Sequence, residues 1–476
     1  MFKTIKEFKT AVQNQPEVLL DVINHYNTKI SQSKLNAYIT QTPELAILKA
    51  KNVIEKIKNG QSSVLCGLPL AVKDVFCTQG VRTTMASKML ENFVPGYEST
   101  VTERLFENDA IMLGKTNMDE FAMGASGKHS AFGATISPIK MNNSTEDLIP
   151  GGSSSGSAAA VAGGLALAAL GSDTGGSVRQ PAAFCGIVGF KPSYGRCSRF
   201  GMIAYASSLD QAGFMANSVE DAALLFSLTQ GIDGKDATLM NIPSENFTNI
   251  TPNVKGKVIG IPKEFMMDGI HPEIIKAWND AKKLLEKNGA TVKEISLAHA
   301  MASIKVYYFI STAEASSNLA RYDGIKYGYR TQKECKTIEE LVAHSRAEGF
   351  GTEVKNRILI GTRNLLSDSY KENYERILKL RTAIKNEFGE VFKTCDAILC
   401  PTTPNLAPPM NHQQTNLEEY INDILTVPVN IAGLPAISIP FGKASCGRPI
   451  GLQLIAKEFN ESILLNTAAV VECLSC

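Results

Sequence analysis

Residues 151–186 constrain the fold most, because small side chains crowd this segment far more densely than an ordinary core would allow. It reads GGSSSGSAAAVAGGLALAALGSDTGGSVRQPAAFCG. The lack of large side chains favours a backbone that closely approaches itself or a bound molecule. Two serines each follow a Gly-Gly pair: Ser153, at the expected start of a small-residue helix, and Ser177, 24 residues later (177 − 153 = 24).

Two non-catalytic interpretations of this segment compete with a catalytic one. A flexible linker is disfavoured, because the apolar runs 158–161 and 165–170 interrupt the glycines. A phosphate-binding loop at a helix N-terminus fits better. However, no Lys-Ser or Lys-Thr follows the glycines, and the Gly-x-Gly-x-x-Gly pattern is absent from the segment.

Nucleophilic catalysis is the third interpretation. Glycines leave neighbouring amides exposed, so the N–H groups of Thr174, Gly175 and Gly176 could stabilise an oxyanion beside a nucleophilic Ser177. Each such donor typically lowers a barrier by roughly 3 kcal/mol. A serine also needs a base, and none of the six histidines has a local motif that links it to Ser177. The sequence therefore neither supports nor excludes a Ser-His-Asp triad.

Lys73 is a second candidate for the base. It follows the apolar run 68–72, which predicts a short strand. A lysine in that place commonly extends to water. Acting as a base would require burial and nearby donors to lower its pKa from about 10.4 toward 7. Lys73 by itself does not decide between these two roles.

The three residues together resemble the amidase signature family: Lys73 within 67–74, and the Gly-Gly-Ser motifs that end at Ser153 and Ser177. The resemblance implies that Ser177 is the nucleophile, that Ser153, preceded by a cis peptide, relays a proton, and that Lys73 is the base. It places the oxyanion hole on the backbone amides from Thr174 to Ser177. It also implies an α/β protein with the amidase signature fold, a large mixed, mostly parallel β-sheet core surrounded by α-helices.

We interpret residues 1–476 as a single amidase domain, because no internal repeat and no long linker divides the chain. Residues 1–60 are predicted to be a helical segment packed on that domain, and residues 67–211 to be its signature core. Within the first segment, Thr42-Pro43, a stripe of apolar residues and Gly60 predict one helix with both of its ends.

Other local patterns predict further elements. Ser218 begins a capping-box-like start to a helix that runs to Thr229. Residues 257–262, 272–287 and 291–297 predict a strand-helix-strand unit. In the segment 111–124, Asn117 and Asp119 could line a pocket, as the resemblance implies, or simply cap a turn.

The second half of the chain bears on the substrate. Segments 314–328, 348–361 and 423–435 resemble the branch of the family that hydrolyses glutamine for tRNA-dependent amidotransferases. Free glutamine is a zwitterion, so a guanidinium suits its α-carboxylate and a carboxylate suits its ammonium.

The resemblance implies that Arg357 binds the carboxylate, that Asp423 binds the ammonium, and that Tyr308 closes the pocket. Without it, Arg357 would be interpreted as a helix-surface arginine paired with Glu353, four residues earlier.

The resemblance also implies partners. It describes a glutaminase subunit that supplies ammonia to a partner, which converts Glu-tRNA(Gln) to Gln-tRNA(Gln) with ATP. This chain would hold no cofactor and no metal, since ATP with Mg would be consumed in the partner. Two further subunits are expected, a kinase/transamidase subunit that binds the tRNA and a small bridging subunit, to give a heterotrimer. The alternatives are a free-standing amidase acting on small amides and a scaffold whose catalytic machinery is idle.

Composition agrees with this assignment. The net charge of +1 gives no sign of a strongly basic nucleic-acid surface or an acidic tail, in keeping with a tRNA held by the partner. The ten cysteines are scattered, which suits a reducing compartment. No apolar run reaches the roughly 18 residues of a membrane span, and the N-terminal residues lack a signal-peptide pattern. We therefore expect a cytoplasmic protein with no membrane contact.

Overall fold

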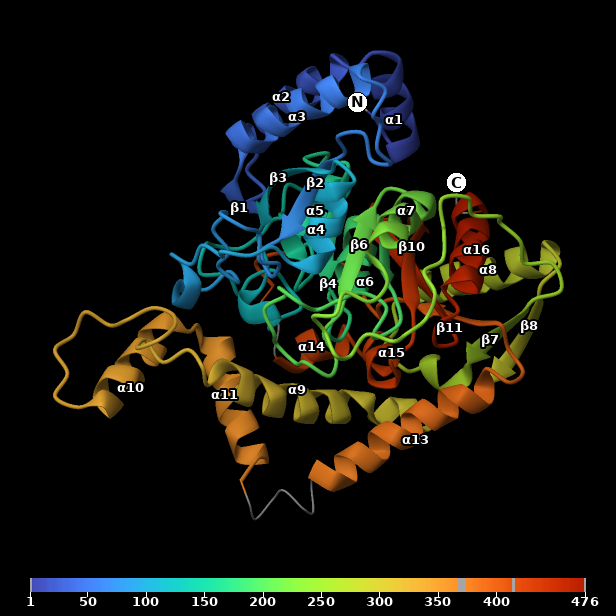
Figure 1. Ribbon diagram of the computed structural model, residues 1–476. Coiled ribbons are helices and arrows are strands. Elements are labelled where there is room, and N and C mark those ends of the chain that lie inside the picture. The colour runs from blue at the N-terminus through green and yellow to red at the C-terminus, as the bar shows by residue number, and fades with distance from the viewer. Residues whose placement is uncertain (1, 367–373, 413–415, 475–476) are drawn as a thin grey trace.

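A computed structural model describes residues 2–366, 374–412 and 416–474 of the chain. Its strands form a single sheet of eleven with the order β1-β3-β2-β4-β6-β5-β10-β11-β9-β7-β8 (Figure 1). The strands are β1 (Tyr38–Gln41), β2 (Pro69–Lys73), β3 (Ile111–Thr116), β4 (Ala168–Ser172), β5 (Val188–Lys191), β6 (Ala212–Ala216), β7 (Val258–Pro262), β8 (Thr291–Ile295), β9 (Ala397–Pro401), β10 (Ala436–Lys443) and β11 (Pro449–Ala456).

The sheet is mixed, as expected, but the prediction that it is mostly parallel is wrong. In the described residues, six of the ten neighbouring strand pairs are antiparallel and four are parallel. The parallel pairs lie in two groups, β3-β2-β4 and β9-β7-β8. Between the groups, neighbours such as β10 and β11 follow one another through a short turn, which permits only antiparallel pairing, whereas a parallel pair requires a long crossover.

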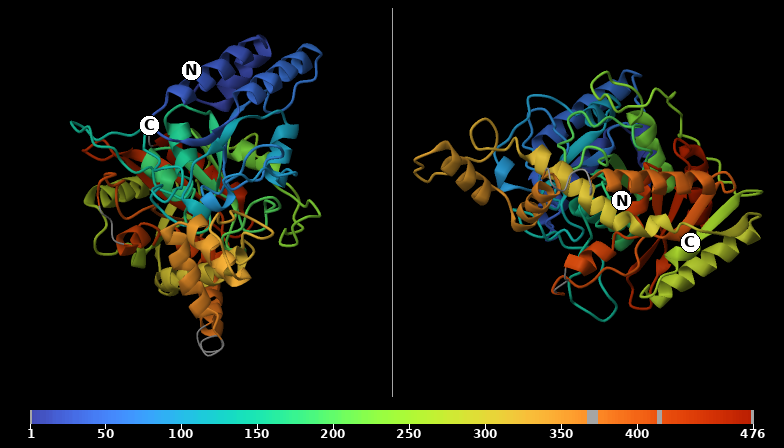
Figure 2. Two further views of the ribbon diagram at one scale, coloured as in Figure 1. Left: turned by 90° about the vertical axis from the view of Figure 1, so that its left-hand side faces the viewer. Right: turned by 90° about the horizontal axis from the view of Figure 1, so that it is seen from below.

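Helices surround this sheet. α1 to α3 form one group beside β1 to β3, and α9 and α13 run side by side along the opposite end of the molecule (Figures 1 and 2). The helices are α1 (Ile5–Asn14), α2 (Val18–Gln32), α3 (Pro43–Lys58), α4 (Thr100–Glu107), α5 (Ser155–Ala162), α6 (Arg179–Cys185), α7 (Val219–Thr229), α8 (Pro272–Lys287), α9 (Ser303–Leu319), α10 (Ile338–Gly349), α11 (Thr352–Asn364), α13 (Glu375–Val391), α14 (Asn416–Ile421), α15 (Val427–Ala432) and α16 (Glu461–Leu474), with short 3-10 turns η1 (Lys88–Leu90), η2 (Glu120–Ala122), η3 (Lys263–Phe265) and η4 (His299–Ala302).

Several local predictions are confirmed. α8 has the predicted bounds, and it connects β7 to its parallel neighbour β8, which ends two residues earlier than predicted. Ser218 caps α7, since its hydroxyl accepts a hydrogen bond from the amide of Asp221 at 3.2 Å. Such elements are specified by residues that are close in sequence, so local patterns are enough to find them.

The prediction that residues 1–60 are helical is wrong at β1. Tyr38–Gln41 forms an edge strand that pairs antiparallel with β3. α3 begins at Pro43 as predicted, but the Thr42 side chain does not cap it. The Thr42 hydroxyl instead donates a hydrogen bond to the carbonyl of Met112 at 3.1 Å. A contact with β3 therefore replaces the local interaction that the pattern suggested.

The sheet has a continuous apolar interior. One cluster of buried hydrophobic side chains extends from Ile5 to Val471, and all residues of β2, β3 and β4 are buried. Among the residues that the structure describes, no helix is both long and apolar enough to span a bilayer. The cysteines of the described ranges, from Cys66 to Cys473, are free thiols.

Trp278 provides a test of this packing. Its side chain is fully buried between α8 and β9, and its indole N–H donates to the carbonyl of Leu399 at 3.1 Å. We expect Trp278→Ala to lower the free energy of unfolding by about 3–5 kcal/mol, because it leaves a cavity and removes the hydrogen bond to the Leu399 carbonyl. Trp278→Phe, which retains most of the apolar volume, is expected to cost less. Urea unfolding followed by circular dichroism measures both changes, and a loss below about 1 kcal/mol in Trp278→Ala would contradict the prediction.

Candidate active site

The three residues that the sequence selected come together at one edge of the sheet. Lys73 ends β2, and Ser177 lies in the loop between β4 and α6. β2 and β4 are parallel neighbours, so their carboxyl ends meet where open α/β sheets commonly bind ligands. Ser153 lies just before α5, which packs against both strands.

The Lys73 amine lies inside a cage of hydroxyl groups. Its Nζ is 2.8 Å from each of Ser153 Oγ, Ser154 Oγ and Ser172 Oγ, and 3.3 Å from the carbonyl oxygen of Ser172. The Lys73 side chain is fully buried. It therefore points inward and does not extend to water.

This cage suits an uncharged amine. A neutral amine has two N–H donors and one lone pair, so it can donate to Ser154 and Ser172 while it accepts the proton of Ser153. Ser154 is a good acceptor, since its own hydroxyl donates to the carbonyl of Ser172 at 3.2 Å. Burial lowers the Lys73 pKa to about 7, although the charges of Asp119, Asp173 and Asp210 act in the opposite direction.

Ser153 and Ser177 are brought close, but their hydroxyls are not joined. The peptide bond between Gly152 and Ser153 is cis, as the resemblance implies. The amide of Ser154 donates to the carbonyl of Ser177 at 3.2 Å, which holds the two loops together. Within the described residues, the Ser177 hydroxyl forms no hydrogen bond, either to Ser153 or to a histidine. The structure therefore shows the link from Lys73 to Ser153 and leaves the Ser177 hydroxyl unpaired.

The loop before Ser177 presents unused backbone amides. The N–H groups of Thr174, Gly175, Gly176 and Ser177 donate no hydrogen bond to any described residue. The loop is instead held through other groups. Thr174 Oγ1 donates to Asp210 at 2.7 Å, and the carbonyls of Gly175, Gly176 and Ser177 all accept hydrogen bonds. Free amides on a fixed loop are the arrangement that an oxyanion hole requires.

Both glycines of this loop are needed for close approach. A Cβ atom on Gly175 would lie 2.7 Å from the ring of Tyr307. Gly176 has a φ of 145°, and a Cβ atom there would collide with the Thr426 side chain. Side chains at these positions would push the loop away from α9 and from the segment that precedes α15.

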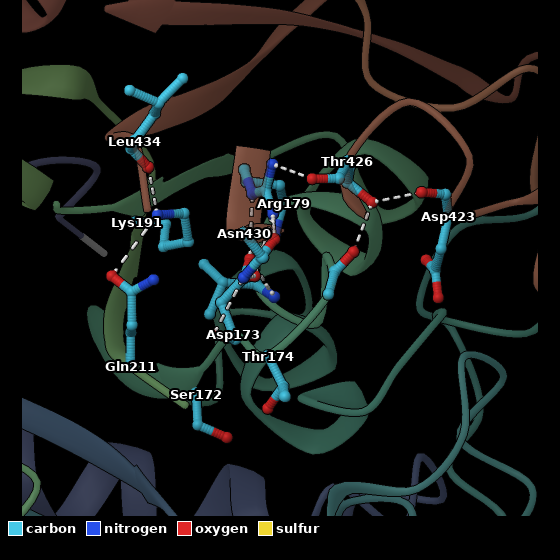
Figure 3. A network of polar contacts seen from close by, with 12 residues as sticks. Ser172, Asp173, Thr174, Arg179, Lys191, Gln211, Asp423, Thr426, Asn430 and Leu434 are labelled. Carbon is cyan, nitrogen blue, oxygen red and sulfur yellow. Dashed lines mark hydrogen bonds and ion pairs between the residues drawn. The ribbon is translucent and has the colours of Figure 1, made fainter. Parts of the chain in front are cut away.

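A buried ion pair fixes the base of the same loop (Figure 3). Arg179 and Asp173 are both fully buried, with Arg179 Nη2 2.9 Å from Asp173 Oδ1 and Nε 3.0 Å from Oδ2. Arg179 also donates to Asn430 Oδ1 at 2.5 Å, to Gln453 Oε1 at 2.6 Å and to the Thr426 carbonyl at 3.1 Å. All five N–H groups of the guanidinium are thereby satisfied.

This pairing keeps Asp173 charged. Burial acts to raise its pKa, but the charge and hydrogen bonds of Arg179 outweigh burial and hold the pKa at about 2. The sequence did not identify Arg179 or Asn430, because their partners lie up to 274 residues away in the chain.

Arg357 and Tyr308, both expected to bind the substrate, lie against each other. Arg357 is 4% exposed, and its guanidinium carbon lies 5.4 Å from the centre of the Tyr308 ring. Arg357 Nη1 donates to Tyr205 Oη at 2.8 Å, and Nε donates to Glu353 at 2.7 Å. The pairing with Glu353 predicted from the helical spacing is thus present, but Arg357 is buried rather than on the helix surface.

Asp423 faces the same loop with an unpaired oxygen. Its Oδ1 is buried and has no hydrogen-bond partner among the described residues. A Cβ atom on Gly176 would lie 3.2 Å from this oxygen. Burial, with the nearby charges of Glu419 and Asp173, raises the Asp423 pKa well above its usual range. An unpaired carboxyl group beside the nucleophile loop is suited to receive a cationic group.

A second acidic group lies beneath Ser153. The Asp119 carboxylate accepts hydrogen bonds from the amides of Gly127 and His129, both at 3.0 Å, and the Asp119 amide donates to the Ser153 carbonyl at 3.2 Å. Asp119 thus organises the turn around the cis peptide, in keeping with the turn-capping role that the sequence offered. Burial raises its pKa to about 6.

The His129 pairing was not predicted. His129 Nε2 lies 3.4 Å from Glu419 Oε2, and this pair connects the Asp119 turn to α14. Burial alone lowers the His129 pKa, but the hydrogen bond to Glu419 and the charge of Asp119 raise it to about 9. No motif near His129 could have indicated this partner, which is 290 residues away.

Among the residues that the structure describes, no three or more His, Cys, Asp or Glu side chains are grouped so that they could hold a metal ion.

Known proteins resemble this chain over nearly its whole length. Residues 21–465 match a family described as Amidase. The chain is 50% identical over 473 residues to the A subunit of glutamyl-tRNA(Gln) amidotransferase from Wolbachia sp. subsp. Brugia malayi (strain TRS), covering 98% of this chain and 96% of the relative. It is 47% identical over 474 residues to the protein of the same name from Jannaschia sp. (strain CCS1), with the same coverage.

A solved structure is also similar. The crystal structure of the A subunit of glutamyl-tRNA(Gln) amidotransferase from Thermotoga maritima superposes with a TM-score of 0.75 at 38% identity, and 91% of each chain is covered. The likeness covers 91% of the chain and is therefore not confined to the small-residue segment.

The Arg179 network yields a stability prediction. We expect Arg179→Lys to lower the free energy of unfolding by about 3–5 kcal/mol, because a lysine cannot bind Asp173 with two donors while also reaching Asn430 and Gln453. Thermal and urea unfolding measure the loss. Arg363→Lys, at an exposed position near the end of α11, is the matched control and is expected to change stability little. Equal stability of the two variants would contradict the prediction.

Proposed function

The chain belongs to the amidase family, and from this premise we propose that it is the glutamine-hydrolysing subunit of a tRNA-dependent amidotransferase. One observation carries the chemistry: a buried Lys73 amine, with its pKa lowered to about 7, lies 2.8 Å from Ser153 Oγ beside the loop of Ser177. The chain is 47–50% identical, over nearly its full length, to proteins named as the A subunits of glutamyl-tRNA(Gln) amidotransferases, which supports the choice of substrate.

The first half of the reaction acylates Ser177. Neutral Lys73 takes a proton from Ser153, and Ser153 takes the proton of Ser177. The unpaired Ser177 hydroxyl completes the relay by turning toward Ser153. Ser177 Oγ then attacks the side-chain carbonyl carbon of glutamine, so a carbon–oxygen bond forms as the carbonyl becomes an oxyanion. The free amides from Thr174 to Ser177 receive that oxyanion.

The second half releases both products. The tetrahedral intermediate collapses, the carbon–nitrogen bond breaks, and the leaving nitrogen takes the proton held by the relay, which gives ammonia and a glutamyl ester on Ser177. Water gives a proton to the same relay and attacks the ester carbon. The bond to Ser177 Oγ then breaks, Ser177 Oγ takes the proton back from the relay, and glutamate is released. Lys73 is neutral again at the end of the cycle.

Recognition of glutamine follows from the charges around the loop. The one Arg357 amino group that forms no hydrogen bond within the described residues is available to the α-carboxylate. The unpaired carboxyl of Asp423 receives the ammonium, which favours its ionised form once substrate is bound. Tyr308, whose ring packs against Tyr420 at a tilt of 40° with ring centres 4.1 Å apart, closes the pocket.

The ammonia is then passed to a partner. In the proposed complex, a kinase/transamidase subunit binds the tRNA and consumes ATP with Mg to convert Glu-tRNA(Gln) to Gln-tRNA(Gln), and a small bridging subunit completes a cytoplasmic heterotrimer. The names of the relatives support an assembly of several subunits.

Loss of the nucleophile tests the reaction. In the chain co-purified with its partner subunits, we expect Ser177→Ala to reduce glutamate release from glutamine by at least about 10³-fold, because no hydroxyl remains to form the ester. Ser31→Ala, on an exposed face of α2, is the control. Retention of glutamine-dependent tRNA amidation in Ser177→Ala would favour the idle scaffold.

The pH dependence tests the base. Only neutral Lys73 can accept a proton, and the neutral fraction rises with pH through its pKa of about 7. We therefore expect kcat/KM for glutamine to fall about tenfold per pH unit below 7 and to level off above it. Lys73→Arg, which stays charged, should be inactive throughout. A profile that is flat from about pH 5.5 to 8 would exclude Lys73 as the base.

Substrate choice separates this proposal from a free-standing amidase. We expect the complex to hydrolyse glutamine and to act far more slowly on simple amides that lack the α-carboxylate and α-ammonium, because these groups pair with Arg357 and Asp423. Rates on both substrates are measured for the isolated chain and for the complex. Strong activity on simple amides, with none on glutamine even when the partners are present, would favour the free-standing amidase.

A further inference from the structure

The corner between α10 and α11 is clamped by the turn that follows β3. Glu120 lies in this turn, is 4% exposed, and accepts a hydrogen bond from the amide of Gly351 at 2.8 Å. Gly351 is the residue immediately before α11. α10 and α11 lie at the periphery of the molecule, away from the sheet (Figure 1). This contact therefore connects the turn that follows β3 directly to the start of α11.

Ser87 makes the clamp two-sided. Its hydroxyl is hydrogen-bonded to Glu120 Oε1 and lies 3.2 Å from the carbonyl of Gly349 at the end of α10. A Cβ atom on Gly351 would collide with the Glu120 carboxylate. The polar clamp therefore holds both ends of the corner and requires a glycine there.

An aromatic cluster supports the same corner. Phe121, the residue after Glu120, packs against Phe350 with ring centres 5.6 Å apart and against Tyr322 at 5.3 Å. Phe121 has a φ of 50°, in the left-handed region. With this backbone conformation, the consecutive residues Glu120 and Phe121 contact the same corner, the first through its carboxylate and the second through its ring.

The corner controls a substrate-binding residue. Arg357 lies six residues after Gly351, about 9 Å further along α11. On the far side, a Cβ atom on Gly361 would collide with the Thr312 carbonyl, so α11 lies directly against α9, which carries Tyr308. α11 is thus fixed at its start by Glu120 and along its length by α9, with Arg357 between the two contacts.

We propose that Glu120 is a positioning residue that sets α11 so that Arg357 meets the α-carboxylate of the substrate. It acts through Gly351 and does not touch the substrate. The inference rests on the proposed function, because Arg357 has a carboxylate to bind only if the substrate carries one. Glu120 thereby contributes to the preference for an amino-acid amide over a simple amide.

The conservative variant separates positioning from charge. In Glu120→Gln, the amide oxygen can accept from Gly351, and the amide nitrogen can donate to Ser87, whose own proton then goes to Gly349. All contacts of the clamp are retained, so we expect near-normal kinetics. Glu120→Ala removes them, and we expect KM for glutamine to rise about 10- to 50-fold with kcat changed less than about threefold.

Matched measurements identify the cause. Glu348→Ala removes a neighbouring carboxylate of α10 that binds Tyr329 and Thr331 instead of the corner, and it is expected to leave KM unchanged. A simple primary amide should be hydrolysed equally by Glu120→Ala and the unmodified complex. In a double-mutant cycle, adding Glu120→Ala to Arg357→Ala should raise KM little further, because the Arg357 side chain that Glu120 positions has already been removed.

The outcomes are distinguishable. If Arg357→Ala raises KM but Glu120→Ala does not, or if the two effects multiply, Glu120 does not position Arg357 and the inference is overturned. If Glu120→Ala slows both substrates alike, its role is general stability and the inference is likewise overturned. If Arg357→Ala leaves KM for glutamine unchanged, the assignment of Arg357 to the α-carboxylate fails, and the inference fails with it. All kinetics are measured on the complex with its partner subunits.

Discussion

Burial of one amine without a directly bound counter-ion is the interaction on which the site depends. Lys73 is surrounded by serine oxygens, and no carboxylate of the described residues contacts it. Lys115, equally buried on the neighbouring strand, has the carboxylate of Asp74 at 3.3 Å. A buried ammonium without a close counter-ion is expensive, so Lys73 gives up its proton near neutral pH and can then act as a base.

The small residues around Lys73 make this burial possible. Gly171 on β4 leaves no room for a Cβ atom beside Ser154, and Gly156 on α5 leaves none beside the backbone of Ala37 and Asn117, so both elements pack closely against their neighbours. Water is thereby excluded without large apolar side chains, and the amine is hydrogen-bonded by serines. The same composition that first marked the segment as unusual is what the electrostatics of the amine require.

The site combines a fully hydrogen-bonded ion pair with neighbouring polar groups that have no hydrogen-bond partner among the described residues. The fully paired Arg179–Asp173 ion pair fixes the base of the nucleophile loop, whereas the loop amides, the Ser177 hydroxyl and Asp423 Oδ1 have no partners in the described residues. Unpaired buried groups are costly. Grouped on a fixed loop and beside it, they are the groups that a zwitterionic amide can pair with, so the free energy lost in the empty site favours binding.

The sequence by itself determined the local elements and the chemistry of the segment: the bounds of α8, the cap of α7, and the residues Lys73, Ser153 and Ser177. Short-range patterns specify these, because their partners are close in sequence or lie in one compact motif. Only the tertiary structure decided the majority of antiparallel pairs, the strand β1, the burial of Arg357, and the contacts of Arg179 with Asn430 and Gln453. The last two contacts join residues 251 and 274 positions apart, and a pattern of neighbours carries no information about which distant side chain will complete a hydrogen bond.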